Sequence, residues 1–258
     1  MKYRVFAIAA HPDDIEFGMG GTLILLKQAG CDIHYMNIAN GSCGTTEYDT
    51  DEIVAIRLKE AQEATKYIGA VFHPPLVPDL EIYYNKETIA KLGSIVREVA
   101  PDILLVPSPE DYMEDHMNAC RLAVSAAFNR GMRNFRVDPP REPVFNDVVV
   151  YHAQPHGNRD PFNRMVEPDF FVNITSVIEE KTEMLASHKS QKEWLDRSQG
   201  FDSYLITMKE HAKEVGELSD RFEFSEGWRK HNPTGFCASD SNPLAELLQS
   251  YFHARRND

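Results

Sequence analysis

Short apolar runs alternate with longer amphipathic segments through the first two thirds of the chain, and this alternation limits the folds open to it. Residues 5–10 are all apolar, which is typical of a strand buried on both faces. Strand and helix in alternation predict a mostly parallel sheet with helices on both faces. We expect strands at residues 5–10, 32–39, 103–106, 148–153 and 170–174, and helices at residues 20–28, 49–68, 86–99 and 116–129.

The chain shows no internal repeat, no low-complexity segment and no linker that divides it. Its 258 residues suit one large domain. We therefore expect a single domain over residues 1–258, with an α/β core over residues 1–175 and a helix-rich C-terminal part over residues 176–258.

Charge and composition exclude several classes of partner. The chain carries 27 basic and 40 acidic residues, a net charge of −13, so we expect no nucleic acid partner. Its longest apolar runs are too short to span a bilayer, and its N-terminus matches a signal peptide poorly, so we expect no membrane partner. Four widely spaced cysteines suggest thiols in a reducing compartment, and we expect a cytoplasmic protein: Cys31, Cys43, Cys120 and Cys237.

Polar side chains follow the first predicted strand at its carboxyl end, where ligands collect in such sheets. The segment His11-Pro12-Asp13-Asp14-Ile15-Glu16 places a histidine beside two aspartates. A turn accounts for Pro12 and the aspartates, and Asp14 could cap a helix. A turn does not need the histidine, however, so the pattern favours a functional site.

A second cluster, Glu110 to His116, follows the strand at residues 103–106. By itself it reads as a helix N-terminus, where acidic residues are favoured by the helix dipole. Taken together, the two strand ends bring His11, Asp14 and His116 to one crevice. Two imidazoles and one carboxylate form a ligand set typical of catalytic zinc sites, and Asp13 could take a proton from a water there.

The residues after the first strand also resemble a known family. His11 to Glu16, followed by Gly18-Met19-Gly20-Gly21-Thr22, resembles the N-terminal signature of the PIG-L/LmbE-like deacetylases. These zinc-dependent enzymes remove acetyl groups from N-acetylglucosamine-type sugars. The similarity covers roughly the first 130 residues and extends to these segments: residues 57–61, 68–70 and 78–80, and the pair Asp115-His116.

The resemblance implies a three-layer, Rossmann-like α/β fold of LmbE type and a homo-oligomer, commonly a trimer or hexamer. It implies Zn²⁺ as cofactor, held by the two histidines and the aspartate named above, although such a set also accepts Fe²⁺. It also implies that Asp13 is the general base and that Arg57 and Asp79 contact sugar hydroxyls.

The chain departs from the family pattern at Met113, where the family usually has a histidine that stabilises the oxyanion or helps protonation. A thioether cannot donate a proton. Either Tyr112 or a histidine from the C-terminal part (His152, His156 or His188) takes over, or the reaction is slow or altered. We count Tyr112, His152 and His188 with Arg57 and Asp79 as candidate substrate-binding residues.

The preferred function is therefore zinc-dependent removal of acetyl from an N-acetylglucosamine-type sugar. One alternative is an amidase for sugar-thiol conjugates, and another is a metal-containing sugar-binding protein without hydrolysis. The glycines at residues 18–21 do not form the GxGxxG pattern of a dinucleotide loop. We expect them to allow close packing and a tight helix entry instead.

Overall fold

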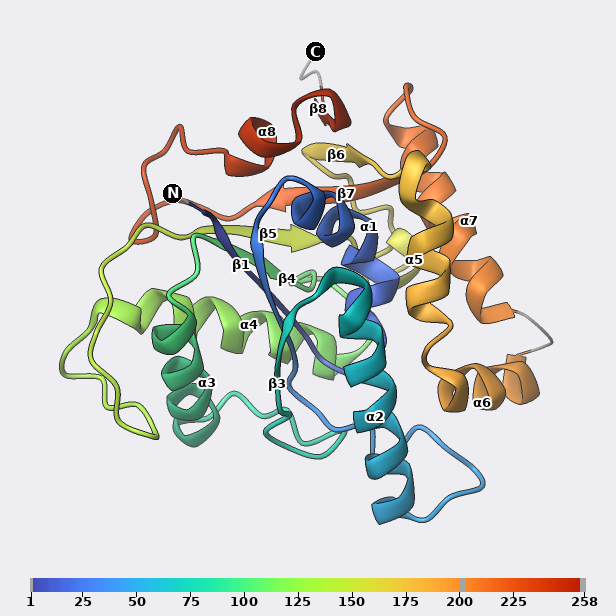
Figure 1. Ribbon diagram of the computed structural model, residues 1–258, viewed down its shortest axis with the longest axis horizontal. Helices are drawn as coiled ribbons and strands as arrows, with labels where there is room; N and C mark the ends of the chain where they lie inside the picture. Colours follow the sequence, from blue (N-terminus) through green and yellow to red (C-terminus); the bar gives the residue numbers. More distant parts are fainter. Residues whose placement is uncertain (1, 200–202, 256–258) are drawn as a thin grey trace.

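The computed structural model describes residues 2–199 and 203–255. Within these ranges one mixed sheet has the strand order β3-β2-β1-β4-β5-β7-β6-β8, and Figure 1 shows helices packed on both of its faces. The strands are β1 (Arg4–Ala9), β2 (Asp32–Asn37), β3 (Val71–His73), β4 (Ile103–Val106), β5 (Val149–Ala153), β6 (Phe170–Asn173), β7 (Ser225–Lys230) and β8 (Phe252–Ala254).

The helices follow the predicted alternation with the strands in the first half of the chain. They are α1 (Asp14–Gln28), α2 (Thr50–Ile68), α3 (Lys86–Val99), α4 (Glu114–Phe128), α5 (Ile178–Leu185), α6 (Lys189–Gln199), α7 (Ser203–Leu218) and α8 (Pro243–Leu248). Short 3-10 turns are η1 (Asn129–Gly131), η2 (His156–Asn158), η3 (Thr175–Val177) and η4 (Gln249–Tyr251).

Strand β1 lies in the interior of the sheet, between β2 and β4, and is parallel to both. The chain leaves β1 toward β2 and β3 on one side and later fills β4 and β5 on the other, so the strand order reverses at β1. In open α/β sheets such a reversal leaves a crevice beyond the carboxyl ends of the two strands. The predicted parallel core is confirmed, and it fixes where a site can form.

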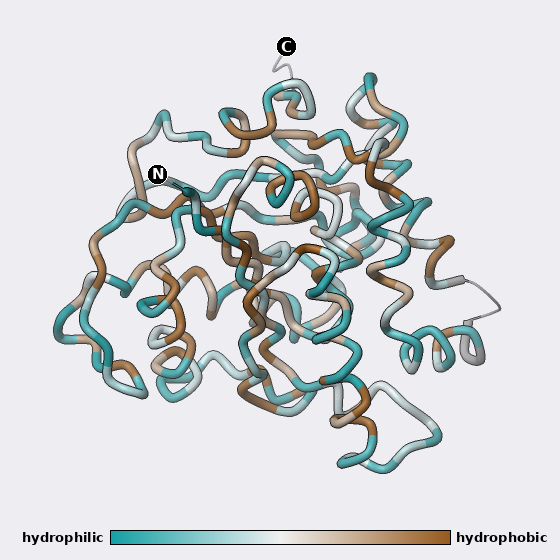
Figure 2. Tube along the Cα trace, in the orientation of Figure 1, coloured by the Kyte–Doolittle hydropathy of each residue, from teal (hydrophilic) through white to brown (hydrophobic). Residues whose placement is uncertain are grey.

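Both faces of the sheet bury apolar side chains, as expected for central parallel strands. Val5, Ala7 and Ala9 of β1 pack into one core with α1, α2, α5 and α7. Phe6 and Ile8 point the other way and pack with α3 and α4. Figure 2 shows the trace through the middle of the molecule as largely brown, whereas the outer loops are largely teal.

Helix α1 begins at Asp14, directly after the turn that follows β1, and not at Gly20 as the pattern predicts. The predicted helix entry at the glycines is therefore wrong, because all of them lie inside the helix. The predicted close packing is confirmed at Gly21. A Cβ at this position would lie 2.6 Å from the Ile174 side chain, so glycine lets α1 approach the end of β6.

The C-terminal part contributes strands as well as helices. Strand β7 inserts between β5 and β6, antiparallel to both, and β8 pairs with β6 at the edge. Sequence patterning misses β7 because its run Ser-Glu-Gly-Trp-Arg-Lys is mostly polar, although Trp228 is fully buried. No helix in the described part of the chain is long and apolar enough to cross a membrane.

A buried ion pair explains why β7 carries a glutamate in the interior. Glu226 Oε1 accepts hydrogen bonds from Lys181 Nζ of α5 at 2.6 Å and from the Gly21 backbone N–H at 2.8 Å. Its Oε2 accepts from the Thr22 backbone N–H at 2.7 Å. The side chains of Lys181 and Glu226 are 0% and 3% exposed. This one carboxylate therefore joins α1, α5 and β7.

We predict that Lys181→Met lowers the free energy of unfolding by about 3–5 kcal/mol, because Glu226 is left as a buried charge without its cation. Denaturant titration measures the change. Lys209→Met is the matched control: it breaks a pair with Glu179, which is 77% exposed, and we expect a loss of at most about 1 kcal/mol. Equal losses in the two variants would contradict this role of the buried pair.

Candidate metal centre and active site

A strained turn connects β1 to α1 and directs two consecutive carboxylates to different partners. Asp13 has φ 111°, in a region that residues other than glycine rarely adopt and that costs about 1–3 kcal/mol. The turn is closed by a hydrogen bond from the His11 backbone N–H to Asp14 Oδ2 at 2.7 Å. Asp14 therefore faces back to His11, whereas Asp13 faces Arg57 and Tyr204.

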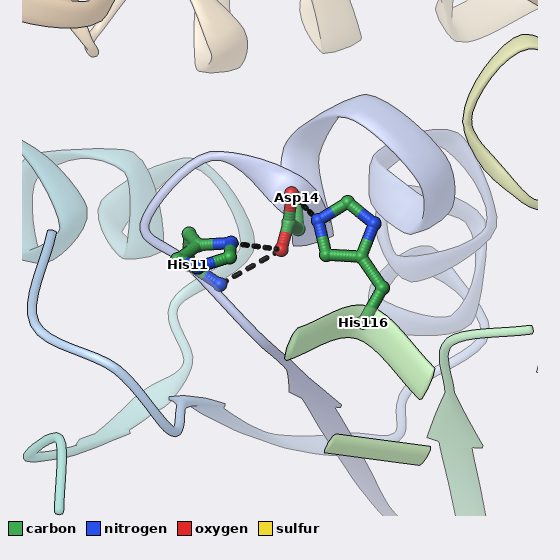
Figure 3. A group of neighbouring side chains, drawn as sticks. All are labelled: His11, Asp14 and His116. Atoms are coloured by element: carbon green, nitrogen blue, oxygen red, sulfur yellow. Dashed lines mark hydrogen bonds and ion pairs between the residues drawn. The ribbon is translucent and has the colours of Figure 1, made fainter. Parts of the chain in front are cut away.

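The structure brings His11, Asp14 and His116 together from the ends of β1 and β4 (Figure 3). His11 Nδ1 lies 3.5 Å from Asp14 Oδ2, and His116 Nε2 lies 3.4 Å from Asp14 Oδ1. One ligand atom from each residue lies within 4.8 Å of the others. His116 reaches the group because α4 begins two residues before it, just beyond β4.

Two further carboxylates hold the outer nitrogens of these histidines. His11 Nε2 lies 3.0 Å from Asp115 Oδ2, which also accepts a hydrogen bond from the Leu80 backbone N–H at 2.7 Å. His116 Nδ1 lies 2.9 Å from Asp111 Oδ1. A carboxylate on the outer nitrogen fixes the ring orientation of a metal-binding histidine. Asp111 and Asp115 both lie in the cluster from Glu110 to His116, but the sequence pattern alone does not predict this role for them.

The electrostatics of the group favour a cation. Burial by itself lowers the pKa of His11, but hydrogen bonds with Asp115 and Asp14 outweigh it and raise that pKa to about 9. Burial also opposes the charged form of His116, yet Asp14 and Asp111 raise its pKa well above the ordinary value. The carboxylates therefore attract positive charge to the space between the rings. Two nitrogens and one carboxylate oxygen fit a divalent transition metal there.

Asp13 sits beside this group with a different environment. Its side chain accepts a hydrogen bond from the Tyr204 hydroxyl at 2.7 Å and lies 3.5 Å from Arg57 Nη2. Burial raises the pKa of Asp13 to about 6, and the Arg57 charge opposes this rise. A carboxyl group with a pKa near neutrality can both take up and return a proton at physiological pH.

Arg57 and Asp79 line the cavity but have partners within the protein. The Arg57 guanidinium donates to the Pro12 carbonyl, next to Asp13. The Asp79 carboxylate accepts from the backbone N–H groups of Gly41 at 2.7 Å and Cys43 at 2.9 Å. Both residues thus shape the loops around Asp13 and the metal group, and their contact with a sugar stays a prediction.

A cavity of about 280 Å³ opens above Asp13 and the candidate ligands. This volume is close to the lower end of the range for small-molecule sites. Aromatic side chains form much of its wall: Phe17, Tyr112, Trp194 and Tyr204. Tyr112 is 60% exposed at the rim, with its ring edge-on to His116 at 5.8 Å between centroids.

The structure does not bring His152 and His188 to this cavity. His152 is buried on β5, with its Nε2 2.8 Å from His231 Nδ1 and its Nδ1 3.2 Å from the Pro107 carbonyl. His188 is fully buried, with its Nε2 3.4 Å from Glu16 Oε1. It lies close enough to Asp13 to affect its pKa but does not line the cavity. Because side chains alternate between the two faces of a strand, the His152 ring is buried against one face of the sheet and does not line the cavity. Of the three histidines that the sequence offers from the C-terminal part, His156, in η2, lies on the cavity wall.

We predict that the chain binds one divalent metal ion per molecule and that His116→Ala loses it. Asp111→Asn should weaken zinc affinity about 10–100-fold, because the amide holds the outer nitrogen of His116 less strongly. Metal content after dialysis and titration against a zinc buffer measure both effects. Asp240→Asn, at an exposed loop position, should leave the affinity unchanged. Full metal retention by His116→Ala would contradict the site.

Known proteins are similar to this chain in sequence and in fold. Residues 6–128 match the PIG-L family, described as GlcNAc-PI de-N-acetylase. The chain is 30% identical over 194 residues to the diacetylchitobiose deacetylase of Thermococcus kodakarensis, which covers 73% of this chain and 70% of that protein. It is 27% identical to the 4-oxalmesaconate hydratase of Pseudomonas putida, over 67% of this chain and 68% of that protein.

The fold agrees with these sequence matches. The structure of the N,N'-diacetylchitobiose deacetylase from Pyrococcus horikoshii, complexed with its inhibitor MPG, superposes with a TM-score of 0.77 and 24% identity. The superposition covers 94% of this chain and 88% of that chain. The expected α/β fold of LmbE type is therefore confirmed. The sequence match over the core and the shared architecture together show that this chain belongs to the PIG-L family of deacetylase-like proteins.

Proposed function

We propose that the protein is a metal-dependent hydrolase that removes the acetyl group from an N-acetylglucosamine-type sugar or glycoside. One observation carries the proposal. Asp13, a buried carboxyl group with its pKa raised to about 6, lies next to a two-histidine, one-carboxylate group on a cavity wall. A base beside a divalent metal site suits the hydrolysis of an amide. The diacetylchitobiose deacetylase relative supports the sugar substrate.

His11, Asp14 and His116 would hold the metal, with zinc as the proposed ion and ferrous iron as the alternative. When bound, such an ion supplies Lewis acidity toward the acetyl carbonyl and lowers the pKa of a neighbouring water. Asp111 and Asp115 would keep the two imidazoles oriented, because each carboxylate contacts an outer ring nitrogen.

Asp13 moves the proton in the proposed reaction. Its carboxylate takes a proton from the water whose oxygen adds to the acetyl carbon. It returns that proton to the sugar nitrogen as the carbon–nitrogen bond breaks, so the products are acetate and a free amine. The Tyr204 hydroxyl and the Arg57 guanidinium hold the carboxylate in position for both transfers.

The cavity wall supports a sugar as the substrate. Aromatic rings such as those of Tyr112 and Trp194 present flat apolar surfaces to the C–H faces of a sugar ring, while Arg57 and Asp79 lie within the same cavity. Small-molecule sites commonly combine such apolar walls with a few polar groups that fix orientation. Contacts of Arg57, Asp79 and Tyr112 with the sugar are part of the proposal.

A hydratase is the second candidate, favoured by the 27% identity to the 4-oxalmesaconate hydratase. A base beside a divalent metal site could also add water to a carbon–carbon double bond. A substrate with several carboxylates needs cations, however. Arg57 is the one arginine or lysine among the described cavity residues. Its guanidinium already contacts Pro12 and Asp13. We therefore rank deacetylation first.

We predict that the zinc-loaded protein releases equimolar acetate and free amine from N,N'-diacetylchitobiose or another N-acetylglucosamine glycoside. Asp13→Asn should keep its zinc but lower kcat about 10²–10⁴-fold, because the amide cannot take up the proton. Acetate assay, amine labelling and metal analysis measure these results. Asp51→Asn, an exposed position on α2, is the matched control and should leave kcat unchanged.

The other functions give different results in the same assays. Unchanged turnover in Asp13→Asn would remove Asp13 as the base. Release of a carboxylic acid from a sugar-thiol conjugate, but not from N-acetyl glycosides, would support the conjugate amidase. Sugar binding without any amide cleavage would support a binding protein, and hydration of an unsaturated carboxylic acid would support the hydratase.

A further inference from the structure

We propose that His156 is a further catalytic residue, whose imidazole N–H donates a hydrogen bond to the acetyl carbonyl oxygen as negative charge develops there. This role rests on the proposed deacetylation. The candidate metal ligands follow β1 and β4. His156 lies in η2, just after β5, so this role would add a third strand end to the active site.

Most polar groups on the cavity wall already have partners. The Tyr204 hydroxyl donates to Asp13, and the Arg57 guanidinium donates to the Pro12 carbonyl. The outer nitrogens of His11 and His116 contact carboxylates. By contrast, neither ring nitrogen of His156 has a hydrogen-bond partner within the described residues. Its ring is free to donate to a bound molecule.

The position of His156 separates it from the other uncommitted donors. Beside Asp14 and His116, a small cavity of about 40 Å³ adjoins the main one, and His156 lines both. Among the described residues, the other donors of the main cavity without a partner include Tyr112, Gln191, Thr207 and the Nε of Arg57, and none of these residues lines the small cavity. His156 is therefore an uncommitted donor beside Asp14 and His116, where an acetyl carbonyl would lie. Tyr112, whose ring lies edge-on to His116 at 5.8 Å, is another described donor near these ligands.

Asp111 links His156 directly to the metal group. Its Oδ2 accepts a hydrogen bond from the His156 backbone N–H at 3.1 Å, while its Oδ1 lies 2.9 Å from His116 Nδ1. One carboxylate thus holds a candidate ligand and the backbone that carries the donor. The His156 ring packs against Phe17 and Tyr112, with centroids 4.8 and 5.6 Å away. A donor held this way needs little reordering during the reaction.

The charge state of His156 suits the role. The His156 side chain is exposed at the cavity, but the protein atoms around its ring, aided by the charge of His116, lower its pKa below the ordinary value. The ring is then a neutral imidazole at neutral pH, with one N–H donor, and it does not repel a cation at the metal group. Met113 lines the same cavity from the start of α4, but its side chain has no N–H, and its backbone N–H already donates to Asp111 Oδ1 at 3.0 Å.

Two substitutions test the donor separately from the ring. His156→Phe keeps a ring against Phe17 and Tyr112 but removes the N–H, whereas His156→Gln keeps an N–H donor. We expect His156→Phe to lower kcat about 100-fold or more, with KM, zinc content and melting temperature unchanged. His156→Gln should stay within about tenfold of the wild type. His253→Phe, in the edge strand β8, is the control and should behave as wild type.

A binding measurement adds a readout that does not depend on turnover. A methylphosphonamidate of glucosamine carries a tetrahedral phosphorus with charged oxygens in place of the acetyl carbon. We expect His156→Phe to weaken its binding by about the factor lost from kcat/KM, because the lost hydrogen bond forms only to developing charge. Binding of glucosamine itself should not change.

Three results would overturn this role of His156. They are kcat of His156→Phe within about threefold of wild type, equal losses in His156→Phe and His156→Gln, and unchanged phosphonamidate binding in His156→Phe. Acetate release that persists in the wild type keeps the proposed function in each case. Absence of acetate release from the wild type would instead overturn the proposed function, and this role with it.

Discussion

The parallel pairing of β1 with β4 is the constraint on which the candidate site depends. The register sets Ala7 opposite Leu105, so both strands end at the same edge of the sheet. His11 and Asp14 leave one strand and His116 follows the other, about a hundred residues later in the chain. Burial of apolar side chains on both faces of β1 holds this register, because slippage by one residue would turn Phe6 and Ile8 to the wrong layer. Burial of the apolar core therefore positions the polar groups at this edge of the sheet.

The acidic residues at this edge of the sheet differ in their partners and in their pKa because their surroundings differ. Asp14 faces two imidazoles, and although burial opposes its ionised form, the charge of His116 lowers its pKa well below the usual value. Asp13, the neighbouring residue, is turned away by a strained backbone, and burial raises its pKa. Asp111 and Asp115 support the histidines from outside. In the proposed reaction the two adjacent carboxylates of Asp14 and Asp13 serve as a ligand and a base, because the turn between β1 and α1 separates their environments.

Local patterns in the sequence were sufficient for the parallel core and for bringing the two strand ends together. They were insufficient where the structure depends on contacts between distant segments. The start of α1 is misplaced because the glycines at residues 18–21 suggest a helix entry, whereas they lie inside the helix and Gly21 is small so that α1 can approach Ile174. Strand β7 was missed because the partner of Glu226 is Lys181 of α5. Likewise, the sequence prediction counts His152 and not His156 among the substrate-binding residues, whereas the structure buries His152 on β5 and places His156 on the cavity wall, with its backbone held by Asp111.

The central claim is that the ends of β1 and β4 form one metal centre. Anomalous X-ray diffraction from crystals of the zinc-loaded protein, collected on both sides of the zinc absorption edge, tests it most directly. We expect a single strong peak per chain, bounded by His11 Nδ1, the Asp14 carboxylate and His116 Nε2. A peak at any other group of side chains, or no peak between these three residues, would contradict the account.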